Sequence, residues 1–350
     1  MFKTLSFLLF NYTIKVMKFT YYIGVDVSKN KLDVAVFKGK LFIYHKLIGN
    51  NKVEVNNFIK SLKSLEGFSL SGAVFCMEHT GIYNNPLLVC LHKKKGNVCL
   101  ESAMQIKSSQ GNIRGKNDKI DAIRIGQYVF KNREQVKLWS PKRDTIVKLE
   151  KLTVLRDRLI GAKKQLSVPL KEQEGFVHEN LINLEKRICK RTLNSLQADL
   201  GKVDKQIDGL IKGDENLSRL FSIITSVKGV GAQTAAQVII RTNEFKNIND
   251  PRKFACYSGV APFAKESGLF KGKARVSHMA NKKVKTLLTL CALVAIGCNE
   301  DIKVYYERKV EQGKNKMSVI NAVRNKLIHR IFACVNQNRR YENSYITTLV

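Results

Sequence analysis

The first part of the chain alternates apolar and polar positions as β-strands do. Residues 21–37, YYIGVDVSKNKLDVAVF, carry β-branched and aromatic residues on both sides of a polar Ser-Lys-Asn-Lys break. This pattern predicts a β-hairpin with Asp26 at the end of its first strand, followed by a strand near 41–47. Residues 53–65 have helical spacing, and the short apolar run 73–77 predicts a buried strand that carries Glu78 at its carboxyl end.

The pattern continues with a helix, a strand and a polar loop. A helix is expected through Pro86 to Lys93 and a strand at Val98 to Glu101, and the Gly/Asn/Lys-rich loop 108–117 opens a helix near Asp118. Strands come first, and helices alternate with the later ones. This order predicts an α/β domain of the ribonuclease-H-like kind over residues 21–140.

From about Asp144 the strand signal disappears and apolar residues recur at heptad-like intervals, which predicts an all-α region of two long helices over 141–215. Spacing alone leaves two arrangements open, a helical hairpin that packs on its own chain and a coiled coil between subunits. The heptad residues are Leu149, Leu152, Leu159 and Leu166 before a break around Pro169 and Gly175, and Leu181, Leu184, Ile188, Leu196, Leu200, Val203, Ile207 and Leu210 after it.

Residues 216–340 are expected to form a mainly helical domain with a glycine-rich turn and a Ser-Gly-rich loop. Gly229 and Gly231 precede an Ala-rich helix, which fits a helix-hairpin-helix turn whose backbone N–H groups bind nucleic-acid phosphate. An ordinary turn between helices is the alternative. The apolar run Leu287 to Ile296 is too short to cross a bilayer and predicts a buried helix, so no membrane partner is expected.

The charge of the chain is strongly positive. Its 350 residues include 61 Lys plus Arg against 29 Asp plus Glu, a formal net charge of +32, and the basic residues are spread along the whole length. Such a surface favours nucleic acid as a partner, although a basic surface that only confers solubility is the alternative. The 44% hydrophobic content predicts folded domains rather than disorder.

The cysteines and the two ends of the chain add little chemistry. Eight cysteines form no C-x-x-C pair and lie mostly in apolar runs, which predicts reduced core residues in a cytoplasmic protein rather than a zinc site or disulfides. Residues 1–20 have a short apolar stretch without a small-x-small cleavage site. We interpret them as an extension, with Met17 as an alternative start of translation, and residues 341–350 as a tail.

Four acids in this basic chain suggest metal-ion chemistry: Asp26, Glu78, Asp118 and Asp121. Asp118 and Asp121 are three residues apart, on one face of a helix, and Asp26 and Glu78 come from strands that can be neighbours in one sheet. Two Mg²⁺ or Mn²⁺ ions roughly 3.5 to 4 Å apart, held by carboxylates, neutralise the oxygens of a phosphodiester under attack. Any one of these acids alone is more typical of a turn, cap or surface, and Asp33 has a weaker claim because it lies inside a strand where a Lys can pair with it.

Three motifs make the set of acids specific. The segments GVDVSKNKLDVAV, MEHTGIY and GKNDKIDAIRIGQY resemble, in order and spacing, the N-terminal domain of the DEDD-type insertion-sequence transposases, the family that includes the Piv DNA invertase. The resemblance covers nearly the whole chain from about residue 21. It implies a catalytic domain like that of the RuvC Holliday-junction resolvases, with Asp26, Glu78, Asp118 and Asp121 as ligands of the metal ions.

The same resemblance assigns a role to Ser267. On its own residues Ser267 has no adjacent His or Lys base and is an ordinary loop serine. The stretch from Phe254 to Leu288 resembles the C-terminal domain of the family, whose catalytic serine occupies the Ser-Gly step after a Gly-x-x-Pro turn, here Ser267. We expect Ser258 to pack in the interior and His79 to cap or pack. The basic residues expected to contact nucleic acid here are Lys271, Lys273, Arg275, Lys282 and Lys283.

These observations predict an insertion-sequence transposase or recombinase that cleaves and transfers DNA strands with divalent metal ions and a serine nucleophile. The family resemblance implies two kinds of partner, DNA at the element ends and target, and a structured noncoding guide RNA. A homo-oligomer, a dimer or a tetramer, is also expected, because the heptad-like spacing of residues 141–215 allows a coiled coil between subunits. Two alternatives stay open: a RuvC-like Holliday-junction endonuclease, which needs the acids and not the serine, and a catalytically inactive nucleic-acid-binding protein.

Overall fold

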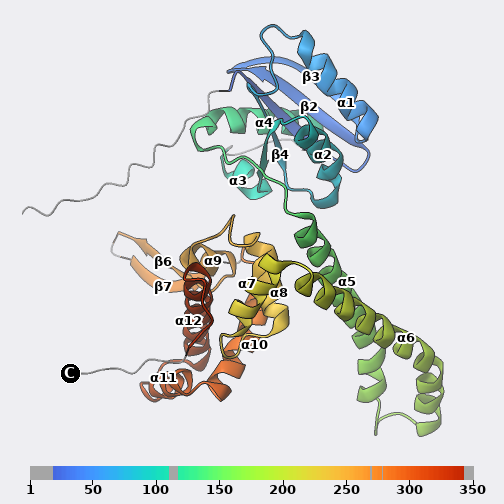
Figure 1. Ribbon diagram of the computed structural model, residues 1–350, viewed down its shortest axis with the longest axis vertical. Coiled ribbons are helices and arrows are strands. Elements are labelled where there is room, and N and C mark those ends of the chain that lie inside the picture. The colour runs from blue at the N-terminus through green and yellow to red at the C-terminus, as the bar shows by residue number, and fades with distance from the viewer. Residues whose placement is uncertain (1–18, 110–116, 269, 278, 343–350) are drawn as a thin grey trace, which may run out of the picture. The chain divides into compact units, whose positions relative to one another are not determined.

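The computed structural model describes residues 19–109, 117–268, 270–277 and 279–342 (Figure 1), without the side chains at 265, 271 and 273. The chain divides into two compact units, unit 1 up to Pro141 and unit 2 from Lys142 onward. Unit 2 contains both the expected helical region 141–215 and the expected domain 216–340, whose separation stays a prediction. Most of the expected extension 1–20 and tail 341–350 lies outside the described residues.

Unit 1 is built on a five-stranded sheet with the order β3-β2-β1-β4-β5. Its strands are β1 (Tyr21–Val27), β2 (Lys31–Lys38), β3 (Leu41–Gly49), β4 (Ala73–Glu78) and β5 (Asn97–Glu101). The first three strands pair antiparallel, whereas β4 is parallel to both β1 and β5. The mixed α/β domain expected from the sequence is therefore confirmed, with strand ends close to those that the alternation predicts.

Helices cover both faces of this sheet. One face packs against α1 (Lys52–Ser61) and α2 (Asn85–Lys93), and the other against α4 (Asp118–Lys131) and the short α3 (Ala103–Ser108). In β1, Tyr21, Ile23 and Val25 lie in the core of the first face, and Tyr22 lies in the core of the second. Because side chains alternate along a strand, Asp26 points to the same face as Tyr22, the face covered by α4.

Two glycines allow α4 to lie directly on the sheet. A Cβ atom on Gly24 would be 2.2 Å from the carbonyl oxygen of Ala122, and one on Gly126 would be 2.5 Å from the ring of Phe37. A side chain at Gly24 would displace the backbone of the helix, and one at Gly126 would displace the ring of Phe37. This close approach brings the first turn of α4 toward the end of β1.

Unit 2 begins with a helical hairpin of α5 (Asp144–Glu172) and α6 (Glu179–Lys212). The two helices pack on each other, so the hairpin arrangement within one chain is present. The break expected around Pro169 and Gly175 is present: α5 continues through Pro169, ends at Glu172, and α6 begins at Glu179. The turn at Gly175, whose φ of +85° favours glycine, separates the helices.

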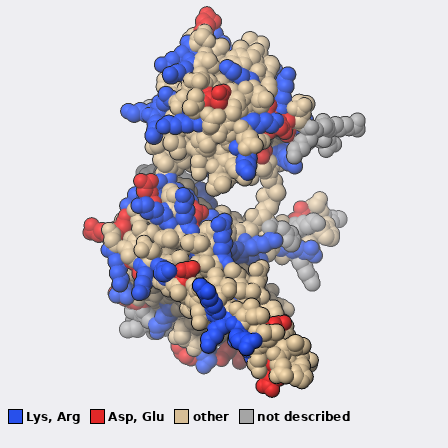
Figure 2. All heavy atoms as spheres, turned by 90° about the vertical axis from the view of Figure 1, so that its right-hand side faces the viewer, with Lys and Arg blue, Asp and Glu red and all other residues tan. Residues whose placement is uncertain are grey.

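The two halves of the hairpin differ in burial. Leu149, Val203 and Ile207 belong to the buried core of unit 2. Leu181 and Ile188, toward the free end, are 56% and 68% exposed. The apolar heptad positions therefore pack on their own chain at the base of the hairpin and face solvent near its tip. Lys and Arg side chains are spread over the surfaces of both units (Figure 2).

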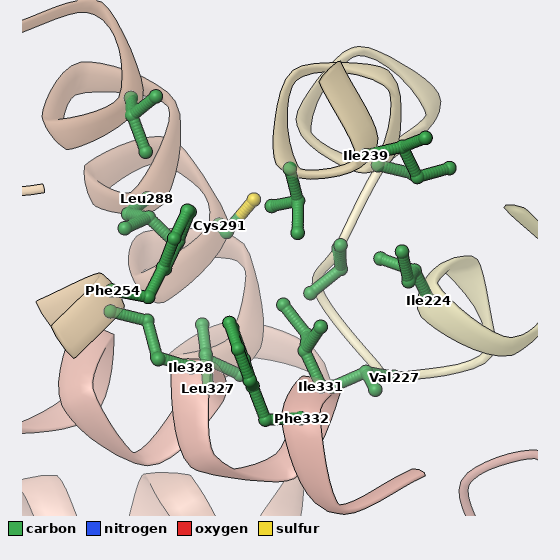
Figure 3. Packing of buried hydrophobic residues seen from close by; sticks show 14 of the residues in the cluster. Ile224, Val227, Ile239, Phe254, Leu288, Cys291, Leu327, Ile328, Ile331 and Phe332 are labelled. Atoms are coloured by element: carbon green, nitrogen blue, oxygen red, sulfur yellow. The ribbon is translucent and has the colours of Figure 1, made fainter. Parts of the chain in front are cut away.

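The rest of unit 2 is helical apart from one β-hairpin. Its core is formed by helices that are distant in sequence, as shown by Ile239, Cys291 and Phe332 in Figure 3. The expected buried helix at Leu287–Ile296 lies within α10 (Lys282–Cys298) but is buried on one side only, since Leu290 and Val294 are 55% and 56% exposed. The elements are α7 (Glu215–Thr225), α8 (Ala232–Thr242), α9 (Pro251–Tyr257), β6 (Pro262–Ser267), β7 (Phe270–Val276), α10 (Lys282–Cys298), α11 (Glu300–Glu311) and α12 (Lys316–Asn336).

Arg143, at the start of α5, joins three segments of unit 2. Its guanidinium donates hydrogen bonds to both Asp214 oxygens at 2.8 and 3.0 Å and to Glu244 Oε2 at 2.9 Å. The Glu244 side chain is fully buried and also accepts from Asn216 at 2.7 Å. Burial alone raises the pKa of Glu244, but the hydrogen bonds from Arg143, Asn216 and Lys246 outweigh it and hold the pKa below its usual value.

Neither a membrane span nor a disulfide occurs among the described residues. No described helix has the length and apolar character needed to cross a bilayer. All eight cysteines are free thiols; five are buried, whereas Cys256 and Cys298 are exposed and depart from the expectation of core cysteines.

Candidate active site

Acidic side chains form a row across the sheet of unit 1, on the face covered by α4. In the strand register Asp26 lies opposite Asp33, and Glu78 lies opposite Glu101. In the parallel pairing of β1 with β4, Asp26 and Glu78 come directly after the last paired residues, Val25 and Met77. The parallel pairing of these two strands explains why the sequence places both acids at the carboxyl ends of apolar runs.

Asp118 and Asp121 add two carboxylates from the first turn of α4. The helix begins after Asn117, whose side chain accepts a hydrogen bond from Lys119 N at 3.0 Å, and acids in this turn interact favourably with the helix dipole. Burial is the main cause that raises the pKa of Asp26 to about 6, and repulsion from Asp118, Asp121, Glu78 and Asp33 adds to it. Asp118, Asp121 and Glu78, the other three acids predicted from the sequence, thus lie close enough to Asp26 to add to this shift, and their role as ligands stays a prediction.

Basic side chains partner several of these acids. Lys31 Nζ lies 2.7 Å from Asp118 Oδ2 and 3.4 Å from Asp33 Oδ2, and the hydrogen bond to Asp118 is the main cause that raises the pKa of Lys31. Arg124 Nη1 lies 3.0 Å from Asp121 Oδ1. Asp33, for which a Lys partner is expected, also forms a hydrogen bond with His45 Nε2 at 2.8 Å. Asp33 is thus engaged by both Lys31 and His45.

The carboxylate oxygens suit a hard divalent cation, but in their present arrangement the acids do not surround a common position for one. Carboxylate oxygens are the ligands that Mg²⁺ and Mn²⁺ prefer, and the raised pKa of Asp26 marks a place where a cation would relieve repulsion. Within the described part of the chain, no three acidic, His or Cys side chains are grouped so as to hold a metal ion. Asp118 and Asp121 instead contact Lys31 and Arg124, so an ion would compete with these two contacts.

Glu101 is the acid that sequence reasoning missed. It ends β5 as Glu78 ends β4, and it accepts hydrogen bonds from Tyr128 Oη at 3.3 Å and from Ser102 N at 3.0 Å. Burial raises the pKa of Tyr128 to about 12, with Glu101 adding to the effect. The signal was available, because an apolar run that ends in an acid is the same pattern that singled out Glu78.

Ser267 lies in unit 2, in a β-hairpin where a loop was expected. It is the last residue of β6, pairs with Phe270 of β7 and is exposed. Gly268 follows with a φ of +54°, which a turn between strands tolerates and most side chains do not. By contrast, Ser258 is fully buried and donates to the carbonyl of Phe254 at 2.8 Å, which agrees with a packing role.

The predicted nucleic-acid-binding residues have varied surroundings. Arg275 on β7 is exposed, and Lys271 and Lys273 lie on the same strand with side chains outside the described part. Lys282 is exposed at the start of α10, whereas Lys283 next to it forms an ion pair with Asp157 of α5. Lys283 is therefore already engaged within unit 2.

The two glycines of the predicted phosphate-binding turn also differ. Gly229 has a φ of +90°, and a Cβ there would lie 2.7 Å from that of Ala295. Close packing on α10 therefore explains this glycine without a ligand. Gly231 precedes α8 as its N-cap, and a Cβ there would meet no atom within 4 Å.

His79 offers no ligand geometry of its own. Its backbone N–H donates to the carbonyl of Glu101 at 3.0 Å, and its side chain is exposed.

Comparison with known proteins gives a class and then a family. A family model described as "Transposase" matches residues 23–173, which include the four acids, and a second, described as "Transposase IS116/IS110/IS902 family", matches residues 221–307, which include Ser267. Both models describe transposases, and together they cover more than half of the chain. The chain is therefore a transposase, and it belongs to the IS116/IS110/IS902 family.

The chain is also similar to individual proteins over nearly its whole length. It is 25% identical to a pilin gene-inverting protein of Moraxella bovis and 26% identical to one of Moraxella lacunata, over 92% of this chain and 97% of each relative. Among solved structures, Thermus thermophilus RuvC in complex with a Holliday junction aligns over 34% of this chain and 99% of its own, with 14% identity and a TM-score of 0.26. The family membership rests on the sequence matches and not on this structural score.

Proposed function

We propose that this transposase cleaves and transfers DNA strands at a metal-dependent site formed by Asp26, Glu78, Asp118 and Asp121. The observation that carries the proposal is the placement of Asp26 and Glu78 side by side at the carboxyl ends of the parallel strands β1 and β4. Burial raises the pKa of Asp26 to about 6, and repulsion from Asp118, Asp121 and Glu78 adds to it. A fold gains nothing in stability from such repulsion, so the arrangement is better explained by a function in which a cation is bound. Divalent ions held there supply charge neutralisation at the phosphate under attack.

The chain's own side chains prepare this site. Lys31, at the start of β2, neutralises Asp118 of α4, and Arg124 neutralises Asp121 within α4 itself. Gly24 and Gly126 set the height of α4 above the sheet, and hence the separation of its acids from Asp26 and Glu78.

Ser267 is the proposed nucleophile. Its Oγ forms a bond to phosphorus while the bond from phosphorus to the 3′ oxygen breaks; the Oγ proton passes to a base, and the leaving oxygen takes up a proton to become a 3′ hydroxyl. The exposure of Ser267 at the end of β6, next to Gly268, supports attack on a large substrate. Ser267 works together with the acids of its own chain or with those of a second subunit.

The proposed partners are DNA, a structured noncoding guide RNA and further copies of the chain. The net charge of +32 supports extensive contact with phosphates. The exposed apolar side chains of Leu181, Leu184 and Ile188 on the hairpin support self-association as a dimer or tetramer. If a preparation freed of RNA by nuclease treatment still recombines donor and target DNA, the guide RNA is not required and that part of the proposal is wrong.

The test compares Ser267→Ala with Asp118→Asn and with a control, Ser277→Ala, at a serine just beyond the same β-hairpin. With Mg²⁺ and DNA carrying the element ends, denaturing electrophoresis should show a covalent protein–DNA adduct for the wild type and for Ser277→Ala, and none for the other two. All variants should still bind DNA. If Ser267→Ala keeps cutting four-way junctions at the wild-type rate, the serine role is wrong and the junction endonuclease is favoured.

A further inference from the structure

A strip of basic side chains on α6 has no role in the proposed catalytic site. Arg187, Lys190 and Arg191 line a shallow concavity together with Asn194, Ser195 and Ala198. All six residues are exposed, and residues 186–198 contain no Asp or Glu. We call this surface, defined by these six residues, the α6 strip.

The α6 strip lies on the outer side of the hairpin. Arg191 is nine residues from both Ile182 and Leu200, which are buried, and nine residues are about two and a half helical turns. Arg191 therefore points away from the side of α6 that packs.

Four other basic residues of the hairpin have partners within the protein. These contacts are Arg156 with Asp204 at 2.6 Å, Lys163 with Gln197 at 2.6 Å, Lys186 with Glu174 at 2.7 Å and Lys202 with Asp199 at 3.1 Å. Within the described residues, Arg187, Lys190 and Arg191 have neither an ion pair nor a side-chain hydrogen bond. Three adjacent cations without a partner repel each other, and an external anion relieves that repulsion.

We propose that the α6 strip binds the phosphate backbone of a nucleic acid. Its three cations and the polar Asn194 and Ser195 are side chains that contact phosphate oxygens without reading sequence. The strip itself has no aromatic or large apolar residue of the kind that anchors a protein partner, which favours nucleic acid over an acidic protein. Duplex DNA and folded RNA share this chemistry, and the test separates them. The proposal is independent of Ser267 and of the metal ligands.

The test compares two full-length variants with the same change of charge on the same helix. The strip variant carries Arg187→Gln, Lys190→Gln and Arg191→Gln; the control carries Lys202→Gln, Lys205→Gln and Lys212→Gln, all exposed residues of α6. Circular dichroism should be the same for both, since only exposed side chains change. Binding is measured by fluorescence anisotropy, with a labelled duplex DNA of arbitrary sequence and a labelled RNA hairpin of equal phosphate number, over a salt series.

The strip variant should bind at least about tenfold more weakly than the control. Its slope of log K against log salt concentration should be smaller in magnitude than that of the control by about 2 to 3, as expected for three lost phosphate contacts. A loss with the RNA alone assigns the strip to RNA, a loss with the duplex alone assigns it to DNA, and a loss with both shows backbone binding common to the two. Equal behaviour of the two variants on both probes overturns the proposal. So does unchanged binding with altered self-association in sedimentation, which would point to a protein partner.

Discussion

Asp26→Asn should stabilise the metal-free protein while it abolishes DNA cleavage. Burial and neighbouring carboxylates raise the pKa of Asp26 from 3.8 to about 6, so its ionised form is disfavoured in the folded state. A shift of that size corresponds to about 3 kcal/mol at about 1.4 kcal/mol per unit. Because Asp26 keeps partial contact with solvent, we expect a gain of about 1–3 kcal/mol in the free energy of unfolding above pH 7.

Asp33→Asn is the matched control, because Asp33 lies opposite Asp26 in the strand register. Asp33 is buried and accepts a hydrogen bond from His45 at 2.8 Å, so its replacement should destabilise the protein by about 1–3 kcal/mol. Urea denaturation in the presence of a chelator measures both variants. A destabilising Asp26→Asn, with the same sign as Asp33→Asn, would refute the claim that the acids repel each other at Asp26.

The pH dependence of the Asp26→Asn effect follows from the direction of the shift. The pKa is higher in the folded state, so between about 3.8 and 6 the folded protein binds more protons than the unfolded one, and rising pH destabilises it. The advantage of Asp26→Asn should therefore vanish below about pH 4 and be complete above about pH 6. Mg²⁺ should raise the stability of the wild type and leave that of Asp26→Asn nearly unchanged.

Three further predictions concern the close packing of α4, the hydrogen bonds of Arg143 and one of the proposed metal ligands. Gly24→Ala puts a Cβ 2.2 Å from the carbonyl of Ala122, so it should displace α4, lower the melting temperature of unit 1 and abolish Mg²⁺-dependent cleavage; wild-type values of both would contradict the close approach. Arg143→Ala should lower the free energy of unfolding in urea by about 2–4 kcal/mol, because Glu244 stays buried with fewer partners. The loss of stability that protonation of Glu244 causes below about pH 4.5 should also become smaller. An unchanged dependence of stability on acid pH would count against this network. Asp121→Asn should end cleavage yet keep DNA affinity and circular dichroism, and residual Mg²⁺-dependent cutting would exclude it as a ligand.

The layout of unit 1 could be predicted from the sequence because strand alternation is local. The pattern of β1 places Asp26 on one face, and the polar loop before Asp118 marks the start of α4. Two strands that each end in an acid predict neighbouring carboxylates once they pair in parallel. Glu101 follows the same rule, and it was missed because no motif drew attention to it.

Features that depend on tertiary packing could not be predicted in the same way. Pro169 stays helical because it lies in the last turn of α5, and the stretch around Ser267 forms a β-hairpin although its Gly and Ser content is typical of a loop. The apolar run in α10 is half exposed, since only one side of that helix meets the core. The ion pair of Lys283 with Asp157 joins positions that no local pattern connects.

The central claim is that the four acids of unit 1 bind divalent ions for DNA cleavage. Anomalous scattering from crystals of the full-length protein soaked in Mn²⁺ tests it most directly. The account predicts manganese within bonding distance of carboxylate oxygens of Asp26, Glu78, Asp118 and Asp121, with Lys31 and Arg124 moved away from Asp118 and Asp121. Manganese bound elsewhere, or none at saturating concentration while both basic contacts persist, would contradict it.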